Sequence, residues 1–201
     1  FAIIWIEDNK KLYGINASGR SPKNLKLEYF KKKGMKKIPA YGPLPVSVPG
    51  CVDGWFEMHD KFGSLEMKKI LEPAISYAEN GFPVTELVSY YLGLSAKNFS
   101  NYPNFNETYL INGSSPKKGQ IFKNKNLANT LRIISNKGRS GFYEGKVAKI
   151  ISEFIIDQGG FLSYEDLKNN KSDWIEPVST NYRGYDIWEL PPNGQGIAAL
   201  Q

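Results

Sequence analysis

The chain has 201 residues, a length typical of one domain, and its 41% hydrophobic content is sufficient for a buried core. Its formal net charge is +6, from 26 basic against 20 acidic side chains. No run of eighteen apolar residues occurs, which excludes a membrane-spanning helix of the usual kind. The single cysteine, Cys51, excludes an internal disulfide and favours a reducing compartment, although secretion stays open because a leader before Phe1 would not be seen.

The basic charge is densest in one short stretch, Lys31–Lys37, which holds five lysines. It lies at the expected end of a helix, where cations oppose the negative pole of the helix dipole. A basic cluster can also contact nucleic acid, but no zinc-finger, ribonucleoprotein or basic-zipper pattern accompanies this one. We therefore expect a solvated helix end, and nucleic-acid binding is the weaker alternative.

The first half of the chain predicts a hairpin followed by helices. Strands are expected at Phe1–Ile6 and Lys11–Ile15, with a turn between them. Ser21-Pro22 is a helix-start pattern and predicts a helix to about Lys33. Further helices are expected over residues 52–62, 65–71, 72–80 and 85–96, where Pro73 separates the second from the third. A turn is expected at 81–84, and a surface loop over residues 98–118.

The second half is also mainly helical until a final hairpin. Leu127, Leu131 and Ile134 share one helical face, and residues 147–155 form the most regular apolar stripe of the chain. Ser163–Asp166 is a capping-box pattern that opens a short helix. A hairpin is expected over residues 174–190 with its turn at 183–184, and its last strand, with Ile187, Trp188 and Leu190, is expected to be buried. A bend and an apolar helix from residue 197 follow. Helices between two hairpins indicate an α+β fold without a domain linker.

Few residues carry a recognisable catalytic pattern. His59 is the only histidine and has no Gly-x-Ser-x-Gly motif nearby, so we interpret it as a packing or surface residue. One histidine and one cysteine give no ligand spacing for a metal, and glycine motifs for phosphate are absent, so neither metal nor cofactor is expected. Cys51 is expected to be a buried packing residue. Glu165 and Asp166 are interpreted as carboxylates of a first helical turn.

Arg20 is the best binding candidate that the residues alone provide. It lies in the loop of residues 16–22, directly after an expected strand, and such loops commonly carry function. A guanidinium group there can hold a substrate carboxylate through two hydrogen bonds. A solvated loop arginine without a binding role is the alternative.

Short blocks along the chain form an ordered series: VPGCVDG at Val48–Gly54, FG at Phe62–Gly63, LEPAI at Leu71–Ile75, AENGFPV at Ala78–Val84, GFYEG at Gly141–Gly145, GGFLSYEDL at Gly159–Leu167 and YRGYDIWELPPNGQG at Tyr182–Gly196. This series resembles, in the same order, the blocks of the γ-glutamyltransferase family, and it covers almost the whole chain. The resemblance implies an N-terminal-nucleophile hydrolase fold, a four-layer αββα sandwich. Residues 1–201 would be an internal, helix-rich segment of its large subunit, within one domain.

The resemblance also implies a mechanism and a partner. A precursor would cut itself into a large and a small subunit, which form a heterodimer without metal or cofactor. The small subunit would begin with a threonine whose hydroxyl attacks the γ-glutamyl carbonyl of a substrate such as glutathione, while its own α-amine acts as base. That nucleophile is expected beyond Gln201. No catalytic residue is therefore expected in this chain, and its threonines are not candidates: Thr85, Thr108, Thr130 and Thr180.

Two departures from the family pattern concern specificity. In the family, an arginine just after the early hairpin pairs with the substrate's α-carboxylate. A match anchored on Pro22 places Ser18 at that position and Arg20 two residues later, so both are predicted to bind substrate. The bend Pro191–Gly196 reads PPNGQG where the typical transferase has paired serines and glycines, and it looks like the branch that includes cephalosporin and glutaryl acylases.

The predicted function is therefore hydrolysis of γ-glutamyl compounds, favoured over transfer to an acceptor amine. Two alternatives stay open at this point. One is an acylase for glutaryl or cephalosporin-type side chains, favoured by Ser18 and by the PPNGQG bend. The other is a non-catalytic paralogue, because no complete active site is visible within the chain.

Overall fold

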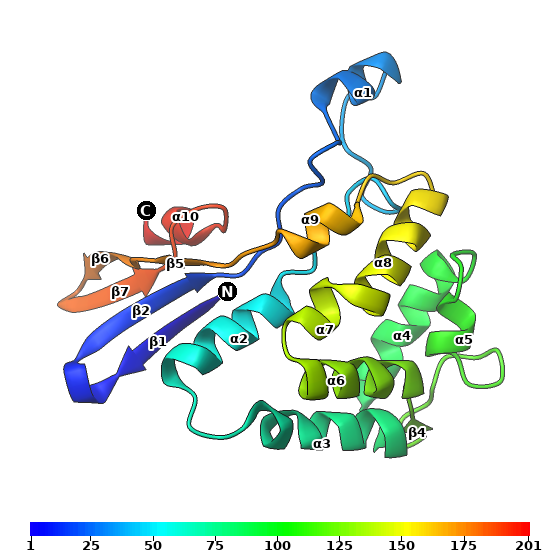
Figure 1. Cartoon of the computed structure of the whole chain (residues 1–201), viewed down its shortest axis with the longest axis horizontal. Helices are drawn as coiled ribbons and strands as arrows, with labels where there is room; N and C mark the ends of the chain where they lie inside the picture. The colour runs from blue at the N-terminus through cyan, green and yellow to red at the C-terminus, as the bar shows by residue number, and fades with distance from the viewer. The chain divides into compact units, whose positions relative to one another are not determined.

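The computed structural model describes all residues from 1 to 201, and the chain forms two compact units (Figure 1). The first unit combines Phe1–Ser64 with Gly138–Gln201, and the second contains Leu65–Lys137. Helices and three small antiparallel sheets make up the chain, as the predicted α+β class requires. None of the helices is both long enough and apolar enough to cross a membrane.

The first sheet begins with the predicted hairpin. Strands β1 (Ala2–Ile6) and β2 (Lys11–Asn16) are joined by a single turn of 3-10 helix at Glu7–Asn9. They pair antiparallel, with Trp5 opposite Leu12. Exposed and half-buried side chains alternate along β1, because successive residues of a strand face opposite sides of the sheet. This confirms the hairpin predicted from the sequence.

The third strand of this sheet comes from the far end of the chain. Strand β5 (Asp173–Ile175) pairs antiparallel with β2, and Asp173 lies opposite Asn16. The prediction of one hairpin over residues 174–190 was therefore wrong in its first part. Pro177 follows β5 and has no N–H for a strand ladder, so the chain leaves the sheet there.

A separate hairpin follows, formed by β6 (Val178–Tyr182) and β7 (Tyr185–Glu189). Its turn lies at Arg183 and Gly184, as predicted, and both residues have positive φ, at 53° and 89°. The expectation of a buried strand was wrong, because the side chains of β7 are exposed up to its last residue. The buried apolar residue of this segment is Leu190, just after the strand.

The helices of the first unit are α1 (Leu27–Lys32), α2 (Cys51–Phe62), α7 (Ser140–Tyr143), α8 (Gly145–Asp157), α9 (Tyr164–Lys168) and α10 (Gly196–Leu200). Helix α8 packs against both α7 and α9. The first unit buries side chains from the sheet, from α2 and from this helical group, including Ile15, Val52, Tyr143, Ala148, Leu162 and Leu167. The ring of Phe62 makes edge-to-face contacts with Tyr13 and Trp174, and these contacts join the C-terminal end of α2 to the first sheet.

Two predictions for the first unit were wrong in detail. Helix α1 begins at Leu27 rather than at Pro22 with Ser21 as its cap, because Leu25 N–H donates to Pro22 C=O in a turn and no side chain caps the helix. In α8 the buried positions are the small residues Ala148 and Ser152, while Ile150 of the apolar stripe is exposed. Small residues bring α8 closest to its neighbours, which sequence hydrophobicity does not indicate.

The second unit is built around a pair of helices, α3 (Met67–Asn80) and α6 (Lys125–Lys137). Its other elements are α4 (Glu86–Phe99), α5 (Phe105–Tyr109) and the paired short strands β3 (Phe82–Pro83) and β4 (Ile121–Phe122). Thr85 caps α4 by accepting the N–H of Val88, as predicted.

Helix α3 is continuous, so the division predicted at Pro73 was wrong. Proline removes one backbone hydrogen bond, but Leu71 and Ala78 of the same helix are buried in a unit where α3 packs against α6, and this packing outweighs the local cost.

Three further expectations for the second unit were also corrected. The loop predicted over residues 98–118 contains α5, and the turn at 81–84 contains β3. On α6, Leu131 and Ile134 are buried as predicted, but Ala128 is buried in place of Leu127.

Candidate functional site

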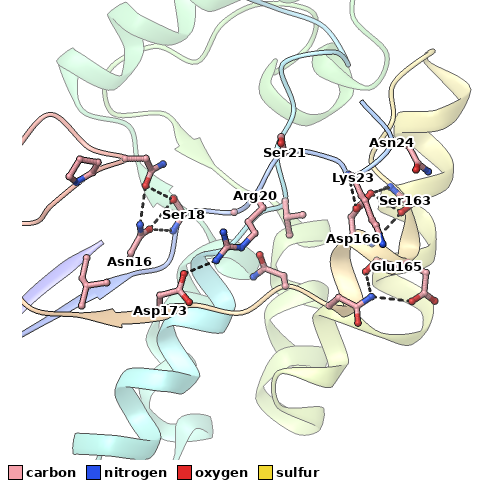
Figure 2. A pocket seen from close by; sticks show the side chains of 17 residues that line it. Asn16, Ser18, Arg20, Ser21, Lys23, Asn24, Ser163, Glu165, Asp166 and Asp173 are labelled. Carbon is pink, nitrogen blue, oxygen red and sulfur yellow. Dashed lines mark hydrogen bonds and ion pairs between the residues drawn. The ribbon is translucent and has the colours of Figure 1, made fainter. Parts of the chain in front are cut away.

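An open cleft of about 1250 Å³ lies within the first unit, where the loop after β2 faces β5 and α9 (Figure 2). Ser18 and Arg20, the two residues predicted to bind substrate, both line it. Asp173 at the start of β5 and Asn193 in the PPNGQG bend complete this part of the wall. The sheet explains the arrangement, because β2 and β5 pair so that the loop leaves β2 beside Asp173.

The loop that carries Ser18 and Arg20 is fixed by close backbone contacts. A Cβ atom at Gly19 would lie 1.5 Å from the carbonyl oxygen of Val48, and one at Gly50 would lie 2.1 Å from that of Ala17. Only glycine fits at such approaches. In addition, Val48 N–H donates to Arg20 C=O at 3.0 Å. The VPGC segment therefore holds the loop in place without help from a ligand.

At one end of the cleft, polar side chains join the loop to the PPNGQG bend. Asn16 Nδ2 donates to Asn193 Oδ1 at 3.0 Å. The hydroxyl of Ser18 lies 2.8 Å from Asn16 Oδ1 and 3.1 Å from Asn193 Oδ1, and its single proton can serve one of them at a time. The hydroxyl proton of Ser18 is therefore used within the protein. The oxygen of Ser18 can still accept a hydrogen bond from a donor group of a ligand.

In the middle of the cleft, Arg20 forms an ion pair with Asp173 (Figure 2). Arg20 Nη2 lies 2.8 Å from Asp173 Oδ2, and the two side chains are 73% and 55% exposed. The contact joins residues 153 positions apart in the sequence. The guanidinium that the sequence assigned to a substrate carboxylate thus already has a carboxylate of the protein beside it.

At the other end, Asp166 ties the loop to α9. One carboxylate oxygen accepts the N–H of Lys23 at 3.0 Å, and the other accepts the N–H and the hydroxyl of Ser163, at 2.9 and 2.7 Å. Ser163 returns the contact by accepting the N–H of Asp166, which completes the predicted capping box. Burial alone would raise the pKa of Asp166, but these hydrogen bonds outweigh it and lower the pKa below its usual value.

The cleft is not a basic site, although the chain is basic overall. Two cations line it, Arg20 and Lys23, against three carboxylates, Glu165, Asp166 and Asp173. The lysines of the stretch 31–37 are not among its lining residues. The charge of the cleft itself gives no general attraction for anions, so binding of a carboxylate there depends on local contact with Arg20.

A buried network holds the chain segment that leads to Asp173. Asp53 on α2 is 2% exposed, pairs with Arg139 and accepts the N–H of Ser172 at 2.5 Å. Arg139 also donates to the carbonyl of Asn170. A buried carboxylate needs such partners, because an unpaired charge inside a protein is costly. The network fixes the backbone immediately before Asp173, and with it the position of the cleft's central carboxylate.

Tyr143 also belongs to this network. Its hydroxyl donates to Pro49 C=O at 2.6 Å and accepts the N–H of Asp53 at 3.0 Å. The side chain is fully buried, and burial raises its pKa to about 12. Tyr143 therefore stays neutral over the physiological range and links the VPGC segment to α2.

His59 and Cys51, which the sequence analysis also considered, lie outside the cleft lining. His59 is half-buried on α2, with Nδ1 3.6 Å from Asp60 of the same helix. The expectation that Cys51 is buried was wrong, because Cys51 is exposed at the first residue of α2. No group of three potential metal ligands occurs in the structure.

Comparison with known proteins decides the family. The model of the gamma-glutamyltranspeptidase family matches residues 1–201. The chain belongs to the γ-glutamyltranspeptidase family. Among curated relatives, the glutathione hydrolase-like YwrD proenzyme of Bacillus subtilis is 35% identical over 201 residues, which is all of this chain and 38% of that protein. The chain thus spans well under half the length of this relative.

Solved structures of the γ-glutamyltranspeptidase family share the fold and confirm the predicted fold class. The cephalosporin acylase of Bacillus halodurans matches with a TM-score of 0.92 and 38% identity, over 98% of this chain and 38% of that one. The γ-glutamyltranspeptidase of Helicobacter pylori matches with a TM-score of 0.90 and 30% identity, over 97% of this chain and 57% of that one. The family thus includes an acylase and a transpeptidase that this chain resembles closely.

Sequence reasoning placed Ser18, Arg20 and the PPNGQG bend at the γ-glutamyltranspeptidase site, and the structure brings all three to one cleft. It missed Asp173, which has no motif around it and meets Arg20 only through the pairing of β2 with β5. Asp173 could have been identified from the sequence only if the third strand of the first sheet had been predicted to begin at this residue.

Proposed function

We propose that the protein containing this chain is a hydrolase of γ-glutamyl compounds, glutathione among them, with transfer to an acceptor amine as the minor route. The match of the γ-glutamyltranspeptidase family model to every residue of the chain carries this proposal. The curated relatives support it through their names, since the YwrD protein and a second Bacillus subtilis relative are glutathione hydrolase or hydrolase-like proenzymes.

In this proposal both units form part of the large subunit of one N-terminal-nucleophile domain. A threonine at the start of a small subunit attacks the acyl carbonyl, and the leaving amine departs with a proton passed through the threonine's α-amine. Water then attacks the resulting ester and releases the acid. The large and small subunits act as a heterodimer. The chain described here contributes the wall that receives the acyl side chain, and none of its residues serves as the nucleophile.

Arg20 and Ser18 are the proposed substrate contacts of this wall. The exposed guanidinium of Arg20 can donate to an α-carboxylate, which is the strongest recognition available in the cleft. Ser18 is held half-buried beside Asn16 and Asn193, so its oxygen can accept a hydrogen bond from the substrate at a fixed position.

An acylase of the same family is the second candidate, and two observations favour it. The acylase of Bacillus halodurans is 38% identical to the chain, against 30% for the Helicobacter pylori transpeptidase. Arg20 is also paired with Asp173, so the arginine proposed to hold the α-carboxylate, the group that distinguishes glutamyl from simpler acyl groups, is already compensated in charge.

The variant Arg20→Ala tests the proposed contact. Full-length, processed protein would be assayed on γ-glutamyl anilide and on butyryl anilide, which has no carboxylate. We expect Arg20→Ala to raise KM for the γ-glutamyl compound by about tenfold, the scale of one charge-assisted hydrogen bond, with little change for butyryl anilide. Arg183→Ala, which removes an exposed arginine of the hairpin turn outside the cleft lining, is the matched control. Equal KM values for Arg20→Ala and wild type on both substrates would remove Arg20 from the binding site.

A further inference from the structure

The Arg20–Asp173 ion pair is not explained by stability. Both side chains are mostly exposed, and exposed ion pairs typically contribute no more than about 1 kcal/mol to folding. The pair is nevertheless held from both sides. Arg20 sits on the loop fixed against Val48, and Asp173 follows the backbone that Asp53 anchors at Ser172. The fold thus places one carboxylate and one guanidinium together at the middle of the cleft.

The geometry leaves the guanidinium accessible but compensates its charge. The contact uses one nitrogen, Nη2, and one carboxylate oxygen, at 2.8 Å, and a guanidinium has five N–H donors. A second carboxylate can therefore reach Arg20. On arrival it meets the charge of Asp173 directly beside it, and like charges at such distances repel. The lining as a whole holds two cations against three carboxylates, so its overall charge does not relieve this repulsion.

We propose that Asp173 is a specificity-determining residue: an internal counter-ion that competes with a substrate carboxylate for Arg20. This inference rests on the proposed function. Asp173 weakens the binding of acyl groups that carry an α-carboxylate, and it does not change the binding of acyl groups that lack one. The site therefore accepts simple acyl side chains alongside γ-glutamyl groups. Amides of uncharged acyl chains are therefore the substrate class whose binding is favoured relative to that of glutathione-like compounds.

The variant Asp173→Asn separates charge from shape, because asparagine is nearly isosteric and its amide oxygen still accepts from Arg20. We expect KM for γ-glutamyl anilide to fall by about three- to fivefold, the scale of one exposed ion pair, with kcat little changed. KM for butyryl anilide should stay the same. Glu176→Gln is the matched control: it removes a carboxylate just after β5 that is paired with Lys11 at 3.5 Å, outside the cleft lining.

The double variant Arg20→Ala/Asp173→Asn tests whether the effect passes through Arg20. In the Arg20→Ala background, Asp173→Asn should no longer lower KM, because the cation it competes for is gone. An equal decrease in both backgrounds would overturn the inference in favour of a general charge effect. An unchanged or raised KM in Asp173→Asn alone would also overturn it, since Asp173 would then orient Arg20 for substrate rather than compete with it.

Failure of the proposed function gives a different pattern. In that case the wild type does not hydrolyse γ-glutamyl anilide. Calorimetric titration of L-glutamate into wild type and Asp173→Asn then decides the inference without turnover. We expect glutamate to bind the variant about three- to fivefold more tightly, again the scale of one exposed ion pair, and equal affinities would overturn the inference.

Discussion

Tyr143 shows how one buried hydroxyl holds the wall of the cleft together. It joins Pro49 C=O to the N–H of Asp53, and through Asp53 it reaches the backbone before Asp173. Burial raises the pKa of Tyr143 to about 12, above the ordinary value of 10.0. A pKa raised in the folded state means that this contribution to stability is complete below pH 10.0 and is lost as the pH rises towards 12.

Tyr143→Phe should therefore lower the free energy of unfolding, although it removes only one hydroxyl group. The variant leaves the N–H of the buried Asp53 and the carbonyl of Pro49 without their partner, which costs about 1–3 kcal/mol. Urea denaturation at pH 7, compared with the exposed control Tyr185→Phe, measures the difference in the free energy of unfolding. Equal stability of Tyr143→Phe and wild type would show that the hydroxyl does not hold the network.

At this scale the sequence predicted the candidate residues on the loop but not their partners. Ser18 and Arg20 follow an obvious strand in a loop with glycine and serine, so their position could be inferred locally. Asp173 could not, because an aspartate 153 positions away carries no local pattern that points to Arg20. Cys51 shows the reverse failure: its residue type predicted burial, but its place at the first residue of α2 leaves it exposed.

Helix α9 and the loop before α1 behave as one element because Asp166 bonds to both. The capping box follows from the sequence Ser163–Asp166 and was predicted, whereas the bond from Asp166 to Lys23 N–H is a tertiary contact between segments 143 positions apart. Because the hydrogen bonds lower the pKa of Asp166, its contribution to stability is present above its ordinary pKa of 3.8. That contribution is lost as the pH falls through the lower value of the folded state.

Asp166→Asn should weaken this element by about 1 kcal/mol at pH 7, since the amide has only one acceptor oxygen for the three donors. The loss should shrink as the pH falls from 3.8 towards the lower pKa of the folded state, because the carboxylate of the unfolded wild type takes up its proton first. Urea denaturation of both proteins between pH 7 and pH 3, with Glu165→Gln as control, measures this convergence. A stability difference that stays constant over this range would contradict the assignment to the ionised carboxylate.

Strand and helix boundaries were predictable where local chemistry decides them. The first hairpin, the Thr85 cap and the turn at Arg183-Gly184 all follow from residue type and spacing. Helix α3 and strand β5 do not. Packing against α6 carries α3 through Pro73, and pairing with β2 separates β5 from the hairpin that follows it. Both depend on contacts distant in sequence, which a local pattern cannot contain.

For the whole molecule, the order of the short blocks was more informative than any single motif. Individually, VPGCVDG or GFYEG predicts only a helix start or a turn, but in series they indicated the family that the match over residues 1–201 then showed. The structure supplies the reason why VPGCVDG and the PPNGQG bend occur together. The first closely contacts the loop that carries Ser18 and Arg20, and the second is bonded to that loop through Asn193.

The most direct test of the central claim is the state of the full-length gene product after expression. We expect it to purify as two chains, the smaller of which begins with threonine, and to hydrolyse γ-glutamyl or simple acyl anilides only after this cleavage. Mass spectrometry with N-terminal sequencing, in parallel with the hydrolysis assay, measures both properties on one sample. A single uncut chain that is fully active would contradict the assignment to an N-terminal-nucleophile hydrolase.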